Sequence, residues 1–117
     1  MKNKKNLFII DDDEAIGQSL KDILDSYYDV ELFTKAKSAI QDLEERKPDG
    51  VLLDYFLPGE NTPEVIQSVR SYSDTLPIII MSANLNLVKN KEKLAVQEFL
   101  EKPFSLDMVL SSLSRYI

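Results

Sequence analysis

The sequence predicts a doubly wound α/β domain, in which a parallel sheet of five strands has helices on both of its faces. Two patterns lead to this fold class. Short apolar runs, typical of strands buried on both faces, alternate along the chain with segments whose apolar residues recur at helical spacing. Strict alternation of strands and helices is typical of parallel sheets joined by right-handed crossovers. With 117 residues, 44% of them hydrophobic, we expect residues 1–117 to form one domain.

The first strand and the first helix are predicted from the residues before position 28. Residues 7–10 are a continuous apolar run, which predicts a buried strand. Acidic residues follow it, and Asp12 or Asp13 can cap the next helix because carboxylates suit a helix N-terminus. The helix is predicted by apolar residues that share one face, namely Ile16, Leu20, Ile23, Leu24 and Tyr27.

The next three elements lead to the central strand. Residues 30–33 predict the second strand, since apolar residues alternate there with an acid. Apolar residues recur at helical spacing over residues 34–46, which predicts a second helix. Residues 51–53 are wholly apolar, as in a strand at the centre of a sheet, and the run stops abruptly on Asp54.

The second half of the chain continues the alternation. Thr62 is the expected N-cap of a third helix, with Pro63 at the first helical position. Residues 78–81, Ile-Ile-Ile-Met, form the most β-like run of the chain, and residues 99–100 predict a short fifth strand. Residues 85–96 between them give the weakest helical pattern, because their middle is polar. Ser105 is expected to cap the last helix.

Composition excludes several classes of function. The chain has no Cys and no His, which removes disulfides, cysteine nucleophiles, the usual zinc ligands and the commonest general base. A net charge of −6 repels nucleic acid, so we expect no direct nucleic-acid partner. No apolar run approaches the roughly 20 residues of a membrane helix, and the basic start lacks an apolar signal segment. We therefore expect a cytoplasmic protein with no membrane partner.

Polar residues follow four of the five expected strands. They are Asp11 and Asp12, Asp54, Ser82 and Lys102. Strands of a parallel sheet end at one edge, where ligands bind, so these side chains are expected to share one shallow cleft. Carboxylates crowded in this way raise one another's pKa, and a hard dication such as Mg²⁺ relieves the conflict. We expect Asp12 and Asp54 to bind Mg²⁺ directly, with Asp11 acting through water and a loop carbonyl completing the shell.

Phosphoryl transfer requires the same set of groups, because the protein must align a nucleophile and absorb charge on the phosphoryl oxygens. A carboxylate can be the covalent nucleophile, and Asp54 is the most central one. Ser82 and Lys102 are placed to hold two phosphoryl oxygens. Each residue alone has an ordinary structural explanation, as a helix cap, a loop hydroxyl or a surface charge. Their coincidence at successive strand ends is what favours a site.

With these residues the chain resembles the receiver domain of two-component response regulators. The matching segments are FIIDDDEAI, KPDGVLLDYFLPG, LPIIIMSA and FLEKPF, in the family's order, and the resemblance covers essentially all 117 residues. It implies the flavodoxin-like (βα)5 fold. Asp54 resembles the phospho-accepting aspartate, and Asp11 and Asp12 resemble the acidic pair that holds Mg²⁺. Further roles follow by position. The resemblance implies that the Phe56 carbonyl is a metal ligand, that the Ser82 hydroxyl engages the phosphoryl group and that Lys102 is the family's site lysine. It also implies a cis peptide before Pro103 and a switch aromatic at Phe99.

The resemblance also implies partners and a mode of action. The phosphoryl donor is a phosphohistidine on a sensor histidine kinase or a histidine phosphotransfer protein, since this chain has no His of its own. Mg²⁺-dependent transfer to Asp54 switches the conformation and controls a downstream protein target or output domain. The implied role is bacterial signal transduction by self-catalysed phosphotransfer with slow autodephosphorylation, not metabolic catalysis.

The chain departs from the family pattern in three places. The loop after Pro58 lacks the usual Asp-Gly pair, and residues 82–102 are shorter than usual, so the helix expected there is short or shifted. Phe56 and Asn84 flank the site where the family places a pair that assists hydrolysis, and they are not a typical pair. We therefore expect the aspartyl phosphate to hydrolyse slowly.

Two alternative functions compete with phosphorylation as interpretations of the sequence. A receiver-like interaction adaptor that is never phosphorylated usually lacks an acid, the hydroxyl or the lysine, and this chain has all of them. A flavin-binding flavodoxin relative needs Ser, Thr and Gly in its first loop to cradle phosphate. Residues 11–14 are acidic instead and repel phosphate in the absence of a metal.

Overall fold

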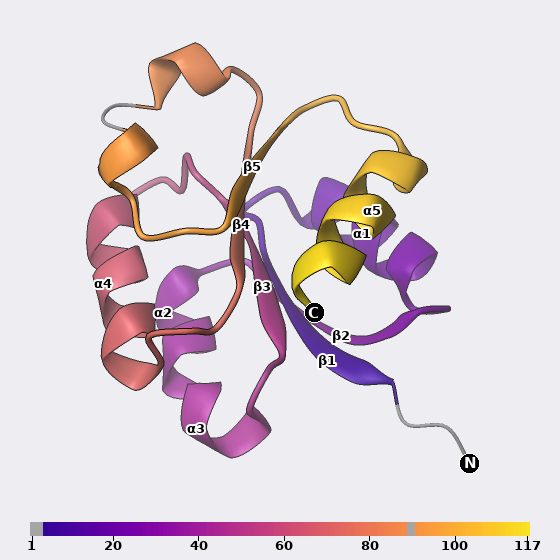
Figure 1. The fold of residues 1–117 in the computed structure, drawn as a ribbon, viewed down its shortest axis with the longest axis horizontal. Coiled ribbons are helices and arrows are strands. Elements are labelled where there is room, and N and C mark those ends of the chain that lie inside the picture. The colour runs from indigo at the N-terminus through magenta and orange to yellow at the C-terminus, as the bar shows by residue number, and fades with distance from the viewer. Residues whose placement is uncertain (1–3, 89–90) are drawn as a thin grey trace.

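The computed structural model describes residues 4–88 and 91–117. Five parallel strands form one sheet in the order β2-β1-β3-β4-β5 (Figure 1). The strands are β1 (Lys5–Ile10), β2 (Tyr28–Phe33), β3 (Gly50–Asp54), β4 (Ile78–Ser82) and β5 (Glu98–Glu101). The α-helices are α1 (Glu14–Leu24), α2 (Ala36–Gln41), α3 (Leu43–Arg46), α4 (Thr62–Tyr72) and α5 (Leu106–Tyr116). The predicted doubly wound α/β fold is confirmed.

Helices cover the two faces of the sheet unequally. Figure 1 shows α1 and α5 on one face and α2, α3 and α4 on the other. Each face has its own apolar cluster, and β3 contributes to both because its successive side chains point to opposite faces. Val51 and Leu53 pack on the side of α2 and α4, whereas Leu52 packs on the side of α1 and α5. This double burial explains why the central strand has no polar alternation.

Helix boundaries differ from the predicted ones at three points. Residues 34–46 form two helices, α2 and α3, because Asp42 leaves the helical ladder and its N–H bonds to the carbonyls of both Ala39 and Ile40. The first helix ends at Leu24, so Tyr27 lies beyond it. The N-cap of α4 is Asn61 and not Thr62: the Asn61 side chain accepts the Glu64 N–H at 3.1 Å. Asp13 and Ser105 cap α1 and α5 as predicted.

The segment between β4 and β5 is the largest departure from strict alternation. Its described residues form two 3₁₀ turns, η1 (Leu85–Leu87) and η2 (Lys91–Lys93), and no α-helix. The segment is short, and a polar stretch interrupts its apolar residues, so it cannot offer a full helix an apolar face to bury. Leu94 and Val96 still pack against the cluster on the α4 side. No helix among the described residues is long and apolar enough to cross a bilayer.

Arg70 ties this irregular segment to α4. Its Nε donates to the Ala95 carbonyl at 2.8 Å, and its Nη1 donates to the Leu76 carbonyl at 2.8 Å. Its Nη2 donates to Gln97 Oε1 at 3.1 Å, and the same oxygen accepts the Ile78 N–H of β4 at 2.7 Å. Burial lowers the pKa of Arg70, against the opposing effect of a nearby acid. One guanidinium therefore joins α4 both to the irregular segment before β5 and to the loop before β4.

Replacing Arg70 with Lys is expected to destabilise the protein by about 2–3 kcal/mol. A single ammonium cannot reach carbonyls that the planar guanidinium contacts on opposite sides, so some of them lose their donor. Urea unfolding measures the change. Arg46→Lys is the matched control, because Arg46 forms ion pairs at 3.2 and 3.3 Å with its side chain 50% exposed. The Arg46→Lys substitution is expected to lower the free energy of unfolding by less than about 1 kcal/mol. Equal losses in the two variants would contradict the assigned role of Arg70.

Candidate functional site

The carboxyl ends of three strands place acids and a lysine together. Asp11 follows β1, Asp54 ends β3, and Lys102 follows β5. Asp11, Asp12 and Asp54 each offer an oxygen, and these oxygens lie within 4.8 Å of one another. Lys102 Nζ lies 3.2 Å from Asp11 Oδ2 and 3.4 Å from Asp54 Oδ2. The structure thus brings together four of the residues predicted from the sequence.

The three carboxylates differ in their surroundings. Asp11 is fully buried, its N–H donates to the Phe33 carbonyl of β2 at 3.0 Å, and its Oδ1 accepts the Asp13 N–H at 3.0 Å. Asp12 is exposed at the mouth of the cluster. Asp54 lies between these extremes and is 9% exposed. Asp11 is therefore fixed by its neighbours, while Asp12 is open to solvent.

Asp54 has an unusual protonation equilibrium. Its burial raises its pKa to about 6, and the charge of Asp11 adds to the effect. The Lys102 ammonium, 3.4 Å from Asp54 Oδ2, and the nearby backbone N–H of Phe56 act in the opposite direction and lower the pKa. The crowding that the sequence predicts is thus present at the central acid.

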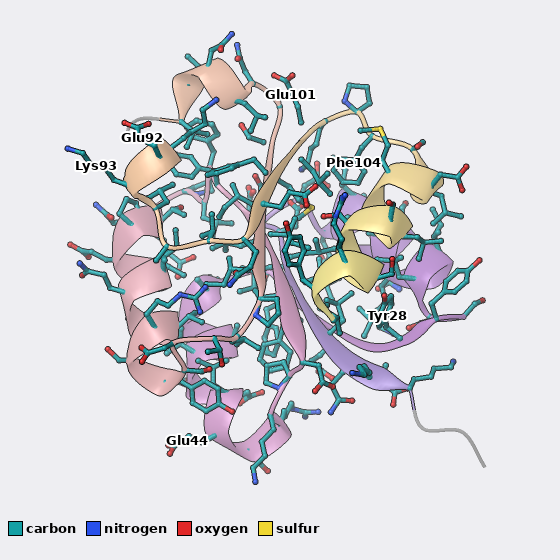
Figure 2. All side chains as sticks on the ribbon, in the orientation of Figure 1. Tyr28, Glu44, Glu92, Lys93, Glu101 and Phe104 are labelled. Atoms are coloured by element: carbon teal, nitrogen blue, oxygen red, sulfur yellow. The ribbon has the colours of Figure 1, made fainter. Side chains whose placement is uncertain are left out.

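Ser82 is buried at the end of β4, where its hydroxyl is engaged by its own loop. Ser82 Oγ donates to the Asn84 carbonyl at 3.1 Å and accepts the Asn84 N–H at 3.1 Å. The Asn84 side-chain oxygen accepts the Asn86 N–H at 2.9 Å and so caps η1. Glu101, labelled in Figure 2 at the end of β5, accepts the Leu85 N–H at 3.0 Å and holds the same turn. No hydrogen bond among the described residues joins Ser82 to the carboxylates.

Three further residues were predicted from the sequence as parts of the site. Phe99 is half-buried on β5 and packs against the apolar cluster on the α4 side. The peptide between Lys102 and Pro103 is cis. Phe56 is 46% exposed, and its ring packs edge-on against Tyr55 with 4.8 Å between the centroids.

The loop from β3 to α4 is held by two side chains, Glu60, which the sequence did not single out, and Thr62, which the sequence predicted only as an N-cap. Glu60 accepts the Ala36 N–H at 2.9 Å and the Lys37 N–H at 3.0 Å, and thereby caps α2, whose own N-cap residue makes no side-chain bond. The Thr62 hydroxyl donates to the Tyr55 carbonyl. A partner that lies 24 residues away in the chain leaves no local sequence signal, so Glu60 was not predictable.

Glu60→Gln is expected to lower the free energy of unfolding by about 1 kcal/mol. The amide keeps one acceptor oxygen but loses the charge and one of the two bonds to the start of α2. Thermal unfolding by circular dichroism measures the change. Glu44→Gln, which alters an exposed acid of α3, serves as the control and is expected to leave the melting temperature unchanged. If both variants melt alike, the Glu60 cap contributes nothing.

The residues of the cluster suit a magnesium ion. Mg²⁺ takes hard oxygen donors, commonly one or two carboxylates with water and a phosphate. The cluster offers carboxylate oxygens from three residues around one point, and the repulsion from Asp11 adds to the burial that raises the pKa of Asp54. A dication placed there removes that repulsion.

Comparisons with known proteins agree with this geometry. The family named response regulator receiver domain matches residues 7–114. Response regulator MprA of Mycolicibacterium vanbaalenii is 32% identical over 108 residues, which are 90% of this chain and 47% of that protein. The chain therefore spans about half the length of the curated relatives it matches.

Solved structures show the same fold. Chemotaxis protein CheY4 of Vibrio cholerae superposes with a TM-score of 0.89 at 23% identity, over 97% of this chain and 99% of that one. Response regulator TrrA of Thermotoga maritima, solved in complex with Mg²⁺-BeF, gives a TM-score of 0.86 at 23% identity, over 97% and 99% of the two chains. The sheet order, the acidic cluster and the family match lead to one conclusion: this chain belongs to the response regulator receiver domain family of bacterial two-component systems.

Proposed function

We propose that this receiver accepts a phosphoryl group on Asp54 in a Mg²⁺-dependent reaction. The observation that carries the proposal is the grouping of Asp11, Asp12 and Asp54 within 4.8 Å, with Lys102 placed on two of them. In the transfer, an Asp54 oxygen forms a bond to phosphorus while the phosphorus–nitrogen bond of a phosphohistidine breaks. The bonding electron pair leaves with the imidazole of the donor.

Each residue of the site has a proposed task. Asp12, Asp54 and the Phe56 carbonyl would hold Mg²⁺, with Asp11 acting through water. The bound ion supplies neutralisation of negative charge on the phosphoryl oxygens. Lys102 would keep its place in the cluster and turn its ammonium from Asp54 Oδ2 to a phosphoryl oxygen.

Ser82 and Phe99 are proposed to report the modification. The Ser82 hydroxyl has to give up the Asn84 carbonyl before it can donate to a phosphoryl oxygen. That change releases one of the bonds that shape the loop before η1. Phe99 packs at the rim of the adjacent apolar cluster and can turn further inward when the loop moves. A downstream protein target or an output domain would recognise the altered surface.

The donor protein has to reach Asp54 from the open side of the cleft. Next to Lys102, an open cavity of about 430 Å³ is lined by Ile16 and Leu20 of α1 and by Pro103 and Phe104 after β5. Figure 2 shows Phe104 beside α5. This apolar rim is the proposed dock for the helix of a sensor histidine kinase or a histidine phosphotransfer protein in the cytoplasm.

Incubation with acetyl phosphate and Mg²⁺ tests the proposal. We expect intact-mass spectrometry to show a gain of one phosphoryl group, which disappears with a chelator or in Asp54→Asn. Asp107→Asn, an exposed acid on α5, is the matched control and should gain the group like the wild type. A wild type that gains no mass would favour the interaction adaptor, and a gain that persists in Asp54→Asn would place the acceptor elsewhere.

A further inference from the structure

A single peptide unit connects Thr62 to Asp54. Thr62 is 3% exposed, and its hydroxyl donates to the Tyr55 carbonyl. The N–H on the other side of that peptide belongs to Phe56, and it is directed toward the Asp54 carboxylate, two residues before it in the chain. Thr62 itself makes no described contact with the acidic cluster, yet it lies one planar group away from the phosphoryl acceptor.

The geometry of the peptide transmits the position of the hydroxyl. A trans peptide is rigid and planar, so its carbonyl oxygen and its N–H point in opposite directions. The preceding N–H, that of Tyr55, donates to the Met81 carbonyl of β4 at 2.9 Å and fixes the start of the loop on the sheet. With that end fixed, a donor on the Tyr55 carbonyl sets the direction of the Phe56 N–H. Hydrogen bonds in such a chain also polarise one another.

The hydroxyl of Thr62 has no other structural task in the described part of the chain. Asn61 caps α4, so the hydroxyl is not used as an N-cap. The rest of the Thr62 side chain is buried. Its packing contribution to stability is reproduced by Val, which has nearly the same shape. The bond from the Thr62 hydroxyl to the Tyr55 carbonyl, next to Asp54, is therefore the feature that needs a functional explanation.

We propose that Thr62 is a positioning residue for the phosphorylation of Asp54, acting through the Tyr55–Phe56 peptide to aim the Phe56 N–H at the acceptor and at the phosphoryl oxygens that form on it. The inference rests on the proposed function of Asp54. Backbone N–H groups directed at developing negative charge stabilise transition states, and removing one such donor costs about 10²–10³ in rate. A donor that is still present but misdirected lowers the rate less, and we expect the rate of phosphorylation to fall roughly five- to tenfold.

The test compares Thr62→Val, which removes the hydroxyl and keeps the shape, with Thr62→Ser, which keeps the hydroxyl. Phosphorylation by acetyl phosphate is followed at saturating Mg²⁺. We expect the maximal rate of Thr62→Val to fall roughly five- to tenfold with little change in the half-saturating acetyl phosphate concentration. Thr62→Ser should stay within about twofold of the wild type, since its hydroxyl can make the same bond.

A spectroscopic measurement separates positioning from simple loss of structure. The Phe56 amide proton, observed by ¹⁵N-edited NMR without acetyl phosphate, is expected to move upfield in Thr62→Val and to stay in place in Thr62→Ser. Ser112→Ala is the matched control: Ser112 is a fully buried hydroxyl on α5 with no hydrogen-bond partner among the described residues. Its removal should change neither the rate nor the Phe56 amide.

The outcomes distinguish this inference from the function on which it rests. A folded Thr62→Val with the wild-type rate and an unshifted Phe56 amide would overturn the role of Thr62 and leave Asp54 as the acceptor. A wild type that is not labelled would overturn both proposals. If Thr62→Val does not fold, Thr62→Ala takes its place, with the same rate loss and the same rescue by Thr62→Ser expected.

Discussion

Replacing Asp54 with Asn is expected to stabilise the metal-free protein at pH 7.5, even though it removes the proposed phosphoryl acceptor. The carboxylate lies in a cleft where burial, together with the charge of Asp11, raises its pKa to about 6 despite Lys102 nearby. The same group in the unfolded chain has a pKa near 3.9. The folded state therefore holds the charged form of Asp54 at a cost, which a neutral amide of the same size does not incur.

The pH dependence of this stabilisation follows from the sign of the shift. Between about pH 4 and 6 the folded state binds more protons than the unfolded state, so the stability of the wild type falls as the pH rises through that window. Above about pH 6 the full penalty is present, and below about pH 4 it is absent. The difference between Asp54→Asn and the wild type should be largest at pH 7.5 and vanish near pH 4.

At pH 7.5 the free energy of unfolding of Asp54→Asn is expected to exceed that of the wild type by about 1–2 kcal/mol. A shift of roughly two pKa units corresponds to about 3 kcal/mol, and solvent screening at the open cleft reduces that figure. A domain of this size gains about 5 °C or more in melting temperature from such a change. Calorimetry in the presence of a chelator measures it, with Asp107→Asn as the exposed control. Addition of Mg²⁺ should stabilise the wild type and reduce the difference in melting temperature between Asp54→Asn and the wild type. Equal melting temperatures of Asp54→Asn and the wild type at pH 7.5 would show that the apo cluster carries no electrostatic strain.

The sheet and the acidic cluster were predictable because their causes are local. Strands buried on both faces produce apolar runs such as residues 51–53, and a polar residue must follow where each run meets the solvent edge. Parallel topology then brings residues as distant in sequence as Asp11 and Lys102 together without further information. The same logic predicted Asp54 at the centre of the site.

The missed features depend on contacts that are not local in the sequence. Thr62 and Asn61 are both good N-cap residues, and the choice between them depends on the Tyr55 carbonyl, which takes the Thr62 hydroxyl. The break between α2 and α3 sits within an uninterrupted helical pattern, so periodicity alone could not place it. No local pattern marks Arg70, because its bond to the Ala95 carbonyl joins residues that are 25 positions apart.

Replacing Phe56 with Asn is expected to shorten the lifetime of the phosphorylated protein roughly tenfold. Hydrolysis requires a water placed opposite the Asp54 oxygen, and positioning of this kind supplies much of the rate of phosphoryl transfer. A phenylalanine ring offers no hydrogen bond to a water. In the structure the Phe56 side chain follows Asp54 by two residues, is half-exposed and packs against Tyr55.

Asn84 does not compensate for Phe56. Its side-chain oxygen is engaged by the Asn86 N–H at 2.9 Å, and its backbone groups bond to Ser82 Oγ, so it is held by its own turn. An amide is also no general base. The Asn84 side-chain oxygen is therefore already engaged, and the Phe56 ring offers no hydrogen bond, so a slow loss of the phosphoryl group is the expected result.

Phe56→Leu is the control that separates the two effects of the ring. Leu is apolar like Phe but smaller, so a lifetime close to that of the wild type is expected if the missing hydrogen bond limits hydrolysis. Lifetimes are measured by loss of the phosphoryl mass after removal of acetyl phosphate, with Mg²⁺ present. Faster decay in Phe56→Asn alone identifies alignment of water as the limiting factor, because only Asn adds a donor and an acceptor at this position. Equal acceleration in both variants would instead assign the long lifetime to steric cover by the ring, and equal lifetimes in all three proteins would show that position 56 does not control hydrolysis.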